Sequence, residues 1–180
     1  FHLAANPEVR VGATDTRVDY EQNILATYTL LEAMRKSEGC KSIVFASSST
    51  VYGEAKIVPT PEDHGPLKPI SLYGASKLAC ESLISGYAHM FGFRGVICRL
   101  ANIVGARSDH GVICDFVRKL EESSRVLTVL GDGTQSKSYL YIDDCVEAIL
   151  AVAEKVKGQV EVYNVVYEDR VDVLTIAEVV

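Results

Sequence analysis

A tyrosine and a lysine stand four residues apart at Tyr73 and Lys77, in the segment YGASK. On a helix, residues four apart lie on one face, so the two side chains are neighbours. A phenol with a pKa of about 10 is a poor base at neutral pH, but a neighbouring ammonium and a cationic cofactor both favour the phenolate. Such a pair can move protons to and from a sugar or alcohol hydroxyl.

The spacing is weak evidence by itself, because Tyr52 and Lys56 share it. Tyr52 lies between a predicted strand and a Pro-rich loop, where a spacing of four does not bring side chains together. Tyr73 instead opens a long predicted helix. An ordinary, partly exposed helical pair stays the alternative interpretation of Tyr73 and Lys77.

A hydroxyl cluster at residues 47–50 gives the pair support. It ends a buried apolar strand, and Ser48 stands 25 residues before Tyr73. The carboxyl ends of parallel strands line the ligand crevice of an open sheet, so Ser48 is expected to face a substrate. The alternative is a serine-rich turn that satisfies its own backbone.

These residues need a scaffold, and the pattern predicts an α/β fold, because short β-branched runs alternate with segments of helical period. The opening run 1–5 looks like a strand. Further strands are predicted at 42–46, 95–99, 126–130, 138–142 and 162–165, and helices at 19–36, 72–91, 112–122 and 144–155. The apolar face of the first helix is expected to contain Ile24, Leu25, Tyr28, Leu31 and Met34.

Turns and caps complete this prediction. Residues 52–71 contain four prolines and read as a long functional loop, with Glu62 solvated. A turn is expected at 131–133, and Asp144 is expected to be the N-cap of the helix that follows it.

Composition excludes several classes of function. Lys and Arg number 18 against 24 Asp and Glu, a net charge of -6 that argues against nucleic acid as the main partner. No apolar run approaches the roughly 18 residues of a membrane span. The histidines are scattered, so no metal site is expected. Zinc and disulfide frameworks are also not expected, and buried thiols in a cytoplasmic protein are predicted for Cys40, Cys80, Cys98, Cys114 and Cys145.

Six motifs together resemble the extended short-chain dehydrogenases/reductases. In order they are FHLAA at 1–5, Asn23 within a helix, SSSTVYG at 47–53, YGASK at 73–77, RLANIVG at 99–105 and GDGT at 131–134. The chain is most similar to the nucleotide-sugar epimerase/dehydratase branch, of the UDP-glucose (UDP-galactose) 4-epimerase kind. The resemblance implies a partial, Rossmann-like doubly wound parallel sheet in residues 1–104. Residues 105–180 would form part of a smaller substrate-binding domain.

The resemblance also implies site roles. Tyr73 would be the catalytic acid/base, Lys77 would bind the nicotinamide ribose, and Ser48 would bind the reacting sugar hydroxyl. The NAD site would further include Ala4, Ala5, Asn23, Ser47 and Leu100. The UDP-sugar would further contact Ser49, Thr50, Asn102, Lys137 and Tyr139. Lys137 falls where these enzymes often carry arginine, and lysine lacks the bidentate fork of that residue.

The implied reaction is epimerisation at C4 through a 4-keto sugar. No carboxylate stands beside Ser48, at Ser49 or Thr50, where family members that dehydrate or decarboxylate usually carry one. This favours hydride transfer without elimination. A dehydratase or reductase of the same superfamily, and a non-catalytic NAD or sugar-nucleotide sensor, stay open as alternatives. The resemblance also implies a homodimer through helices 19–36 and 72–91, and it leaves the sugar and the nucleotide open.

A Gly-rich phosphate-binding turn of the Gly-x-Gly-x-x-Gly type does not occur in the sequence. The resembling families place it ahead of the strand with which this chain begins. We therefore expect the natural protein to be longer at both ends, and the 180 residues alone to bind NAD weakly or not at all.

Overall fold

A computed structural model describes residues 1–123 and 125–180, which divide into two compact units. The first contains Phe1–Leu100 and Ala148–Val165, and the second contains Ala101–Glu147 and Val166–Val180. The family resemblance implies one boundary, near residue 104. It missed the return of residues 148–165, because a strand in that segment completes the sheet of the first unit.

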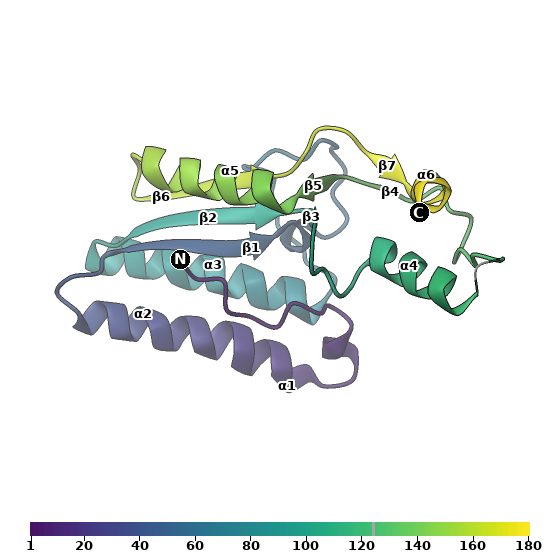
Figure 1. The fold of residues 1–180 in the computed structure, drawn as a ribbon. Helices are drawn as coiled ribbons and strands as arrows, with labels where there is room; N and C mark the ends of the chain where they lie inside the picture. Colours follow the sequence, from purple (N-terminus) through teal and green to yellow (C-terminus); the bar gives the residue numbers. More distant parts are fainter. Residues whose placement is uncertain (124) are drawn as a thin grey trace. The chain divides into compact units, whose positions relative to one another are not determined.

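The first unit is built on a parallel sheet, as predicted (Figure 1). Its strands β1 (Ser42–Ser48), β2 (Arg94–Leu100) and β6 (Val160–Val165) pair in the order β1-β2-β6. The opening segment adds a parallel bridge between His2 and Phe45. Strand β1 continues two residues past its predicted end, because Ser47 and Ser48 still pair with β2.

The first helical region differs most from its prediction. It consists of α1 (Thr16–Asp19), a π-helical segment η2 (Tyr20–Leu25) and α2 (Ala26–Lys36). It begins earlier than residue 19, because the side chain of Asp15 caps the amide of Arg17. A short 3₁₀ turn, η1 (Val11–Ala13), precedes it.

The buried face of this region is also not the predicted one. Leu31 and Met34 are buried and Ile24 is half-buried, but Leu25 and Tyr28 are 43% and 46% exposed. A π-helical segment shifts the register of side chains around the axis, which a pattern of constant helical period does not anticipate. The buried stripe therefore begins with polar side chains, from Asp19, Asn23 and Thr27.

Helix α3 (Leu72–Phe91) has the predicted bounds. Ser71 caps its start by accepting a hydrogen bond from the amide of Gly74, and Gly92 ends it with a φ of 72°. Helices α2 and α3 lie side by side along one face of the sheet (Figure 1). The core that they share with the sheet contains Leu31, Met34, Ile43, Phe45, Cys80, Ile84, Ala88 and Phe93.

The second unit contains two short strand pairs. Strands β3 (Asn102–Val104) and β5 (Tyr139–Tyr141) are parallel, and β4 (Ser136–Lys137) and β7 (Val171–Asp172) are antiparallel. Helix α4 (Val112–Glu122) has its predicted bounds, and α6 (Val173–Val179) ends the chain. Gly131 and Gly133 both have positive φ in the expected turn.

Two local predictions in the later part of the chain are wrong, the strand at 126–130 and the N-cap at Asp144, whereas the strand predicted at 138–142 is confirmed as β5. Residues 126–130 form no strand: Val126 and Leu130 are exposed, and the carbonyl of Thr128 accepts a hydrogen bond from Lys119. The predicted strand 138–142 ends at Tyr141. Helix α5 (Ile142–Lys155) starts at the next residue, so Asp144 lies in its first turn and is not its N-cap.

Cysteine burial was also overestimated. Cys80, Cys98 and Cys145 are buried, but Cys40 is exposed and Cys114 is half-buried. Within residues 1–123 and 125–180, no cluster of His, Cys, Asp and Glu could hold a metal ion. None of the helices in that part of the chain is long and apolar enough to cross a membrane.

Candidate active site

Ser48 ends strand β1 and begins the 3₁₀ turn η3 (Ser49–Tyr52). Its side-chain oxygen accepts hydrogen bonds from the amide of Thr50 at 3.2 Å and from the hydroxyl of Thr50 at 3.0 Å. Ser48 therefore satisfies the backbone of its own turn, which is the alternative interpretation of the hydroxyl cluster. These contacts use the oxygen as an acceptor and leave its proton to be donated elsewhere.

A hydrogen bond with Ser48 favours the phenolate of Tyr73 and works to lower its pKa. The structure therefore brings together the end of β1 and the start of α3, 25 residues apart in the chain.

Lys77 lies one helical turn beyond Tyr73 and is 4% exposed. Its Nζ donates to the carbonyl of Ala46 at 2.8 Å and lies 5.7 Å from the centre of the Tyr73 ring. Burial lowers the pKa of Lys77, while Cys80 and Asp19 act to raise it.

The net pKa shift of Tyr73 is opposite to the expected one. Burial raises its pKa above the ordinary value, with Ser48 opposing and the charge of Asp19 adding to the rise. The Lys77 ammonium donates to the backbone carbonyl of Ala46 rather than to the phenol. The protein alone therefore favours the neutral phenol.

A close approach of α3 to the end of β1 permits the contact of Ser48 with Tyr73. A Cβ placed on Gly74 would stand 2.8 Å from the carbonyl oxygen of Thr50 and 3.0 Å from Pro69. Only glycine fits this separation without a shift of the backbone. Gly74 thus sets how near the helix can lie to the strand end.

The residues assigned to NAD occupy different environments. Ala4 is exposed, and Ala5 and Leu100 are half-buried near the carboxyl ends of their strands. Ser47 is buried and donates to the Glu81 carboxylate.

Asn23 is 1% exposed, and its side chain is engaged within the protein. It accepts from the amide of Asn6 at 2.8 Å and donates to Asp19 at 3.2 Å and to Ser76 at 2.7 Å. The structure therefore gives Asn23 a place in an internal network rather than on an open surface.

The residues assigned to the substrate divide between the units. In the first unit Ser49 is exposed and Thr50 half-buried. In the second unit, Asn102 and Tyr139 are register partners on β3 and β5. The side chain of Asn102 donates to the carbonyl of Ser138 at 2.9 Å. Lys137 is exposed.

Sequence reasoning missed a buried polar network beside this site. Arg99 forms a two-pronged ion pair with Glu81, with distances of 2.8 and 3.1 Å, and both side chains are nearly inaccessible. Arg99 also donates to the hydroxyl of Tyr52 and to the carbonyl of Glu62. The available signal was an arginine within an otherwise apolar strand.

This network fastens the long Pro-rich loop to the sheet. Tyr52 donates to the side chain of Asn164 on β6, and the Glu62 carboxylate accepts from the amide of Asn164 at 2.9 Å. Glu62 is exposed, as predicted, and its carboxylate also accepts this hydrogen bond. The loop is held over the carboxyl ends of the strands by Arg99 on β2 and Asn164 on β6.

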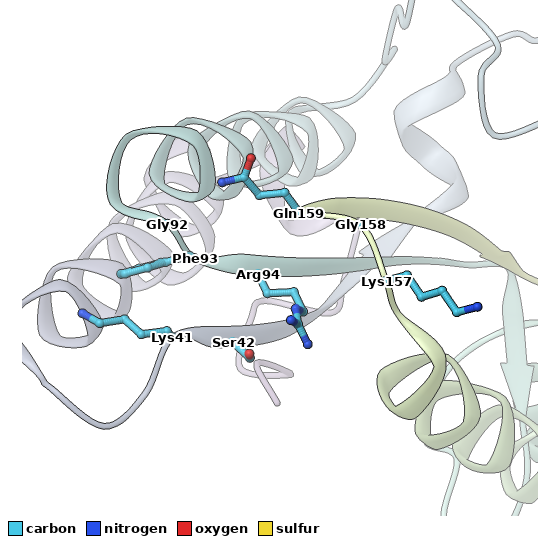
Figure 2. A pocket seen from close by; sticks show the side chains of 8 residues that line it. All are labelled: Lys41, Ser42, Gly92, Phe93, Arg94, Lys157, Gly158 and Gln159. Carbon is cyan, nitrogen blue, oxygen red and sulfur yellow. The ribbon is translucent and has the colours of Figure 1, made fainter.

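Figure 2 shows a cavity of about 470 Å³ at the opposite end of the sheet. Lys41, Arg94 and Lys157 all contribute to its lining, together with Ser42, Gly92, Phe93, Gly158 and Gln159. The Nζ of Lys41 is engaged by carbonyls at the end of α2, and Lys157 points away from Lys41 (Figure 2). The cations do not converge, and the cavity lies at the amino ends of β1 and β2, away from Ser48.

Comparison with known proteins agrees with this geometry. Residues 1–165 match the NAD dependent epimerase/dehydratase family. A putative UDP-glucose 4-epimerase of Methanocaldococcus jannaschii is 35% identical over 154 residues, covering 83% of this chain and 50% of that protein. The parallel α/β sheet and this match over residues 1–165 define the class of protein. The chain belongs to the NAD dependent epimerase/dehydratase family.

Solved structures support the same assignment. A UDP-galactose 4-epimerase is 47% identical, with a TM-score of 0.90, over 99% of this chain and 59% of that one. A UDP-glucuronic acid 4-epimerase from Bacillus cereus, in complex with UDP-glucuronic acid and NAD, is 32% identical with a TM-score of 0.86, over 97% and 55%. The chain thus spans between half and three fifths of the length of these relatives.

Proposed function

We propose that the protein containing this chain interconverts the C4 epimers of a UDP-sugar, of the UDP-glucose/UDP-galactose type, with NAD as its resident cofactor. The observation that carries the proposal is that Ser48 at the end of β1 acts to lower the pKa of the Tyr73 phenol at the start of α3, with Lys77 one turn further along that helix. The likeness to a UDP-galactose 4-epimerase at 47% identity favours this sugar over the glucuronate of more distant relatives.

The residues present fit NAD in two respects. The opening segment pairs with β1 at His2, and the small side chains of Ala4 and Ala5 follow toward the carboxyl edge of the sheet, where they leave room for a ligand. Lys77 uses one of three N–H donors on Ala46, so donors are left for ribose hydroxyls.

When bound, NAD accepts hydride from C4 of the sugar, returns it to the opposite face, and adds a positive charge that favours the Tyr73 phenolate. Tyr73 takes the proton of the 4-hydroxyl during oxidation and gives it back during reduction. Ser48 holds that hydroxyl in line with Tyr73. Lys77 supplies a fixed cation one turn from the phenol.

The neighbours of Ser48 favour epimerisation over elimination. Ser49 and Thr50 carry hydroxyls where a dehydrating site needs a carboxylic acid near the leaving group. Hydride transfer in both directions leaves net redox unchanged and needs no such acid.

The test uses the complete gene product, incubated with NAD and UDP-galactose, while absorbance of NADH and the sugar products are followed together. A C4 epimer without net NADH supports the proposal. Stoichiometric NADH would identify a dehydrogenase, loss of water from the sugar would identify a dehydratase, and NAD binding without product would identify a sensor. Each of these three outcomes contradicts the epimerase.

We also propose that the protein is a homodimer through the first helical region and α3. Exposed apolar side chains support this interface: Leu25 and Tyr28 on the former, and Leu72, Met90 and Phe91 on the latter.

A further inference from the structure

Asp19 is a carboxylate that the mechanism above does not use, and it is 2% exposed. Its Oδ1 accepts hydrogen bonds from the side-chain amides of Asn6 at 2.9 Å and Asn23 at 3.2 Å. Its Oδ2 is buried without a hydrogen-bond partner among the described residues. Burying a carboxylate this incompletely paired is costly, so its retention calls for a physical role.

A chain of short hydrogen bonds leads from Asp19 to the backbone of Tyr73. Asn23, held by Asp19, donates from Nδ2 to the hydroxyl of Ser76 at 2.7 Å. Ser76 in turn donates to the carbonyl of Tyr73 at 2.7 Å. Asn23 and Ser76 are 1% and 3% exposed, so water does not compete for these contacts.

The backbone on either side of the Asp19 carboxylate fixes its position. The π-helical segment η2 begins at the next residue, and such segments are frequent at functional sites. On the other side, a Cβ placed on Gly12 would stand 2.6 Å from Oδ2 of Asp19. Glycine therefore lets the η1 turn close over the carboxylate, which fixes its position.

The charge of Asp19 reaches the proton-transfer pair. It acts to raise the pKa of Tyr73 and also that of Lys77. The other titratable groups in this corner are the thiol of Cys80, which also raises the pKa of Lys77, and His2, whose pKa is lowered by burial and then by Lys77.

We propose that Asp19 is a positioning residue for Tyr73, acting through Asn23 and Ser76, and that its negative charge faces the Tyr73–Lys77 pair. This role rests on the proposed function, because it concerns the residue that moves the proton. Asp19 itself touches neither sugar nor cofactor in this account. It fixes where the phenol stands and how readily the phenol ionises.

Two substitutions in the complete gene product separate position from charge. Asp19→Ala removes the acceptor that holds Asn23, and we expect kcat to fall about tenfold, the effect of losing one hydrogen bond to a charged group. The KM for the UDP-sugar should change by less than about twofold, since ground-state binding is not altered. Asp19→Asn keeps an acceptor oxygen and removes the charge that raises the pKa of Tyr73, so kcat at neutral pH should rise rather than fall.

Ser76→Ala tests the connection to Tyr73 from its other end. It should lower kcat in the same way. The kcat of the double variant Asp19→Ala/Ser76→Ala should be no lower than that of the less active of the two single variants. The matched control is Glu21→Gln, which removes an exposed acid two residues from Asp19. Independent, additive losses would show that the two residues do not act through one network.

A measurement without substrate makes the test independent of turnover. Carbon-13 NMR of protein labelled at tyrosine Cζ, with Tyr73→Phe to assign the signal, follows the ionisation of Tyr73 directly. Asp19→Asn should lower the titration midpoint of Tyr73, and Glu21→Gln should leave it unchanged. In steady-state kinetics, Asp19→Asn should move the acid limb of the plot of kcat against pH to lower pH.

An unchanged Tyr73 midpoint in Asp19→Asn, or an unchanged kcat in folded Asp19→Ala, overturns the proposal. If Asp19→Ala does not fold, Ser76→Ala and the Asp19→Asn titration decide the question. Failure of the proposed function gives a different result: wild-type protein would not epimerise the sugar, while the NMR titration would still report whether Asp19 faces Tyr73.

Discussion

Opposing influences set the ionisation of Tyr73. Burial and the charge of Asp19 raise its pKa, while the hydrogen bond of Ser48 lowers it. A base must be deprotonated to accept a proton, so a raised pKa reduces the active fraction at neutral pH. The site is therefore expected to depend on Ser48 and on the charge of a bound cofactor.

Substitution of Ser48 tests this balance. Ser48→Ala removes the contact that lowers the pKa of Tyr73, so that pKa should rise and the acid limb of the kcat profile should move to higher pH. At neutral pH the rate should fall by about 10²-fold, as for loss of a positioned group in proton transfer. Steady-state kinetics across pH measures both effects. Ser82→Ala, at an exposed position on α3, is the control, and equal profiles for the two variants would contradict the assignment.

The buried pair of Glu81 and Arg99 is expected to matter for stability. Glu81→Leu leaves the Arg99 guanidinium buried without its partner, which should cost about 3–5 kcal/mol in the free energy of unfolding. Urea denaturation measures this loss. Glu21→Leu breaks the exposed pair with Arg17 and should have little effect. Equal urea midpoints for the two variants would show that the buried pair does not fasten the loop.

At the scale of elements, the start of α3 has to lie close to the end of β1. Gly74→Ala would push a methyl group against the Thr50 carbonyl, so it should both destabilise the protein and move Tyr73 away from Ser48. We expect kcat to fall at least about tenfold, because small displacements of a reacting group are costly.

Gly86 provides a control on the same helix. A Cβ at Gly86 meets nothing within 4 Å, so Gly86→Ala should stabilise the helix by up to about 1 kcal/mol and leave kcat unchanged. Thermal unfolding and initial rates compare the two variants. An active, stable Gly74→Ala protein would show that the close approach is not needed.

Elements with strong local signals could be predicted from the sequence. Helix α3 has its cap at Ser71 and its stop at Gly92, and its predicted bounds are those observed. The first helical region was harder, because the π-helical segment and the buried polar stripe follow from tertiary contacts with α3. The run 126–130 has strand-like composition but pairs with no strand in the described structure.

In the candidate site, too, only the residues with local sequence signals could be predicted. Ser48 and Tyr73 could be singled out because both belong to motifs at the ends of regular elements. The network of Arg99 could not, since its partners Glu81, Tyr52 and Glu62 lie 18, 47 and 37 residues away and carry no shared motif. The role of Asn23 within a buried network likewise depends on contacts with Asn6 and Ser76, across the fold.

At the scale of the whole molecule, a charge introduced into the proposed dimer interface should prevent the dimer from forming. Tyr28 is 46% exposed on α2, and Tyr28→Glu would place a carboxylate in an apolar interface. Light scattering after size-exclusion chromatography should show a dimer for the wild-type gene product and a monomer for this variant. Val117→Glu on α4, at a site 42% exposed, should leave the dimer intact. A monomeric wild-type protein would contradict the interface.

The central claim is that Tyr73 moves the proton during epimerisation at C4. The most direct test is proton NMR of UDP-galactose, and separately of UDP-N-acetylglucosamine, with NAD and the complete gene product. The account predicts that C4 epimers of one of these sugars interconvert without net NADH, and that Tyr73→Phe slows this by about 10²–10⁴-fold while remaining folded. An unchanged sugar spectrum with folded wild-type protein, or full activity in Tyr73→Phe, would contradict it.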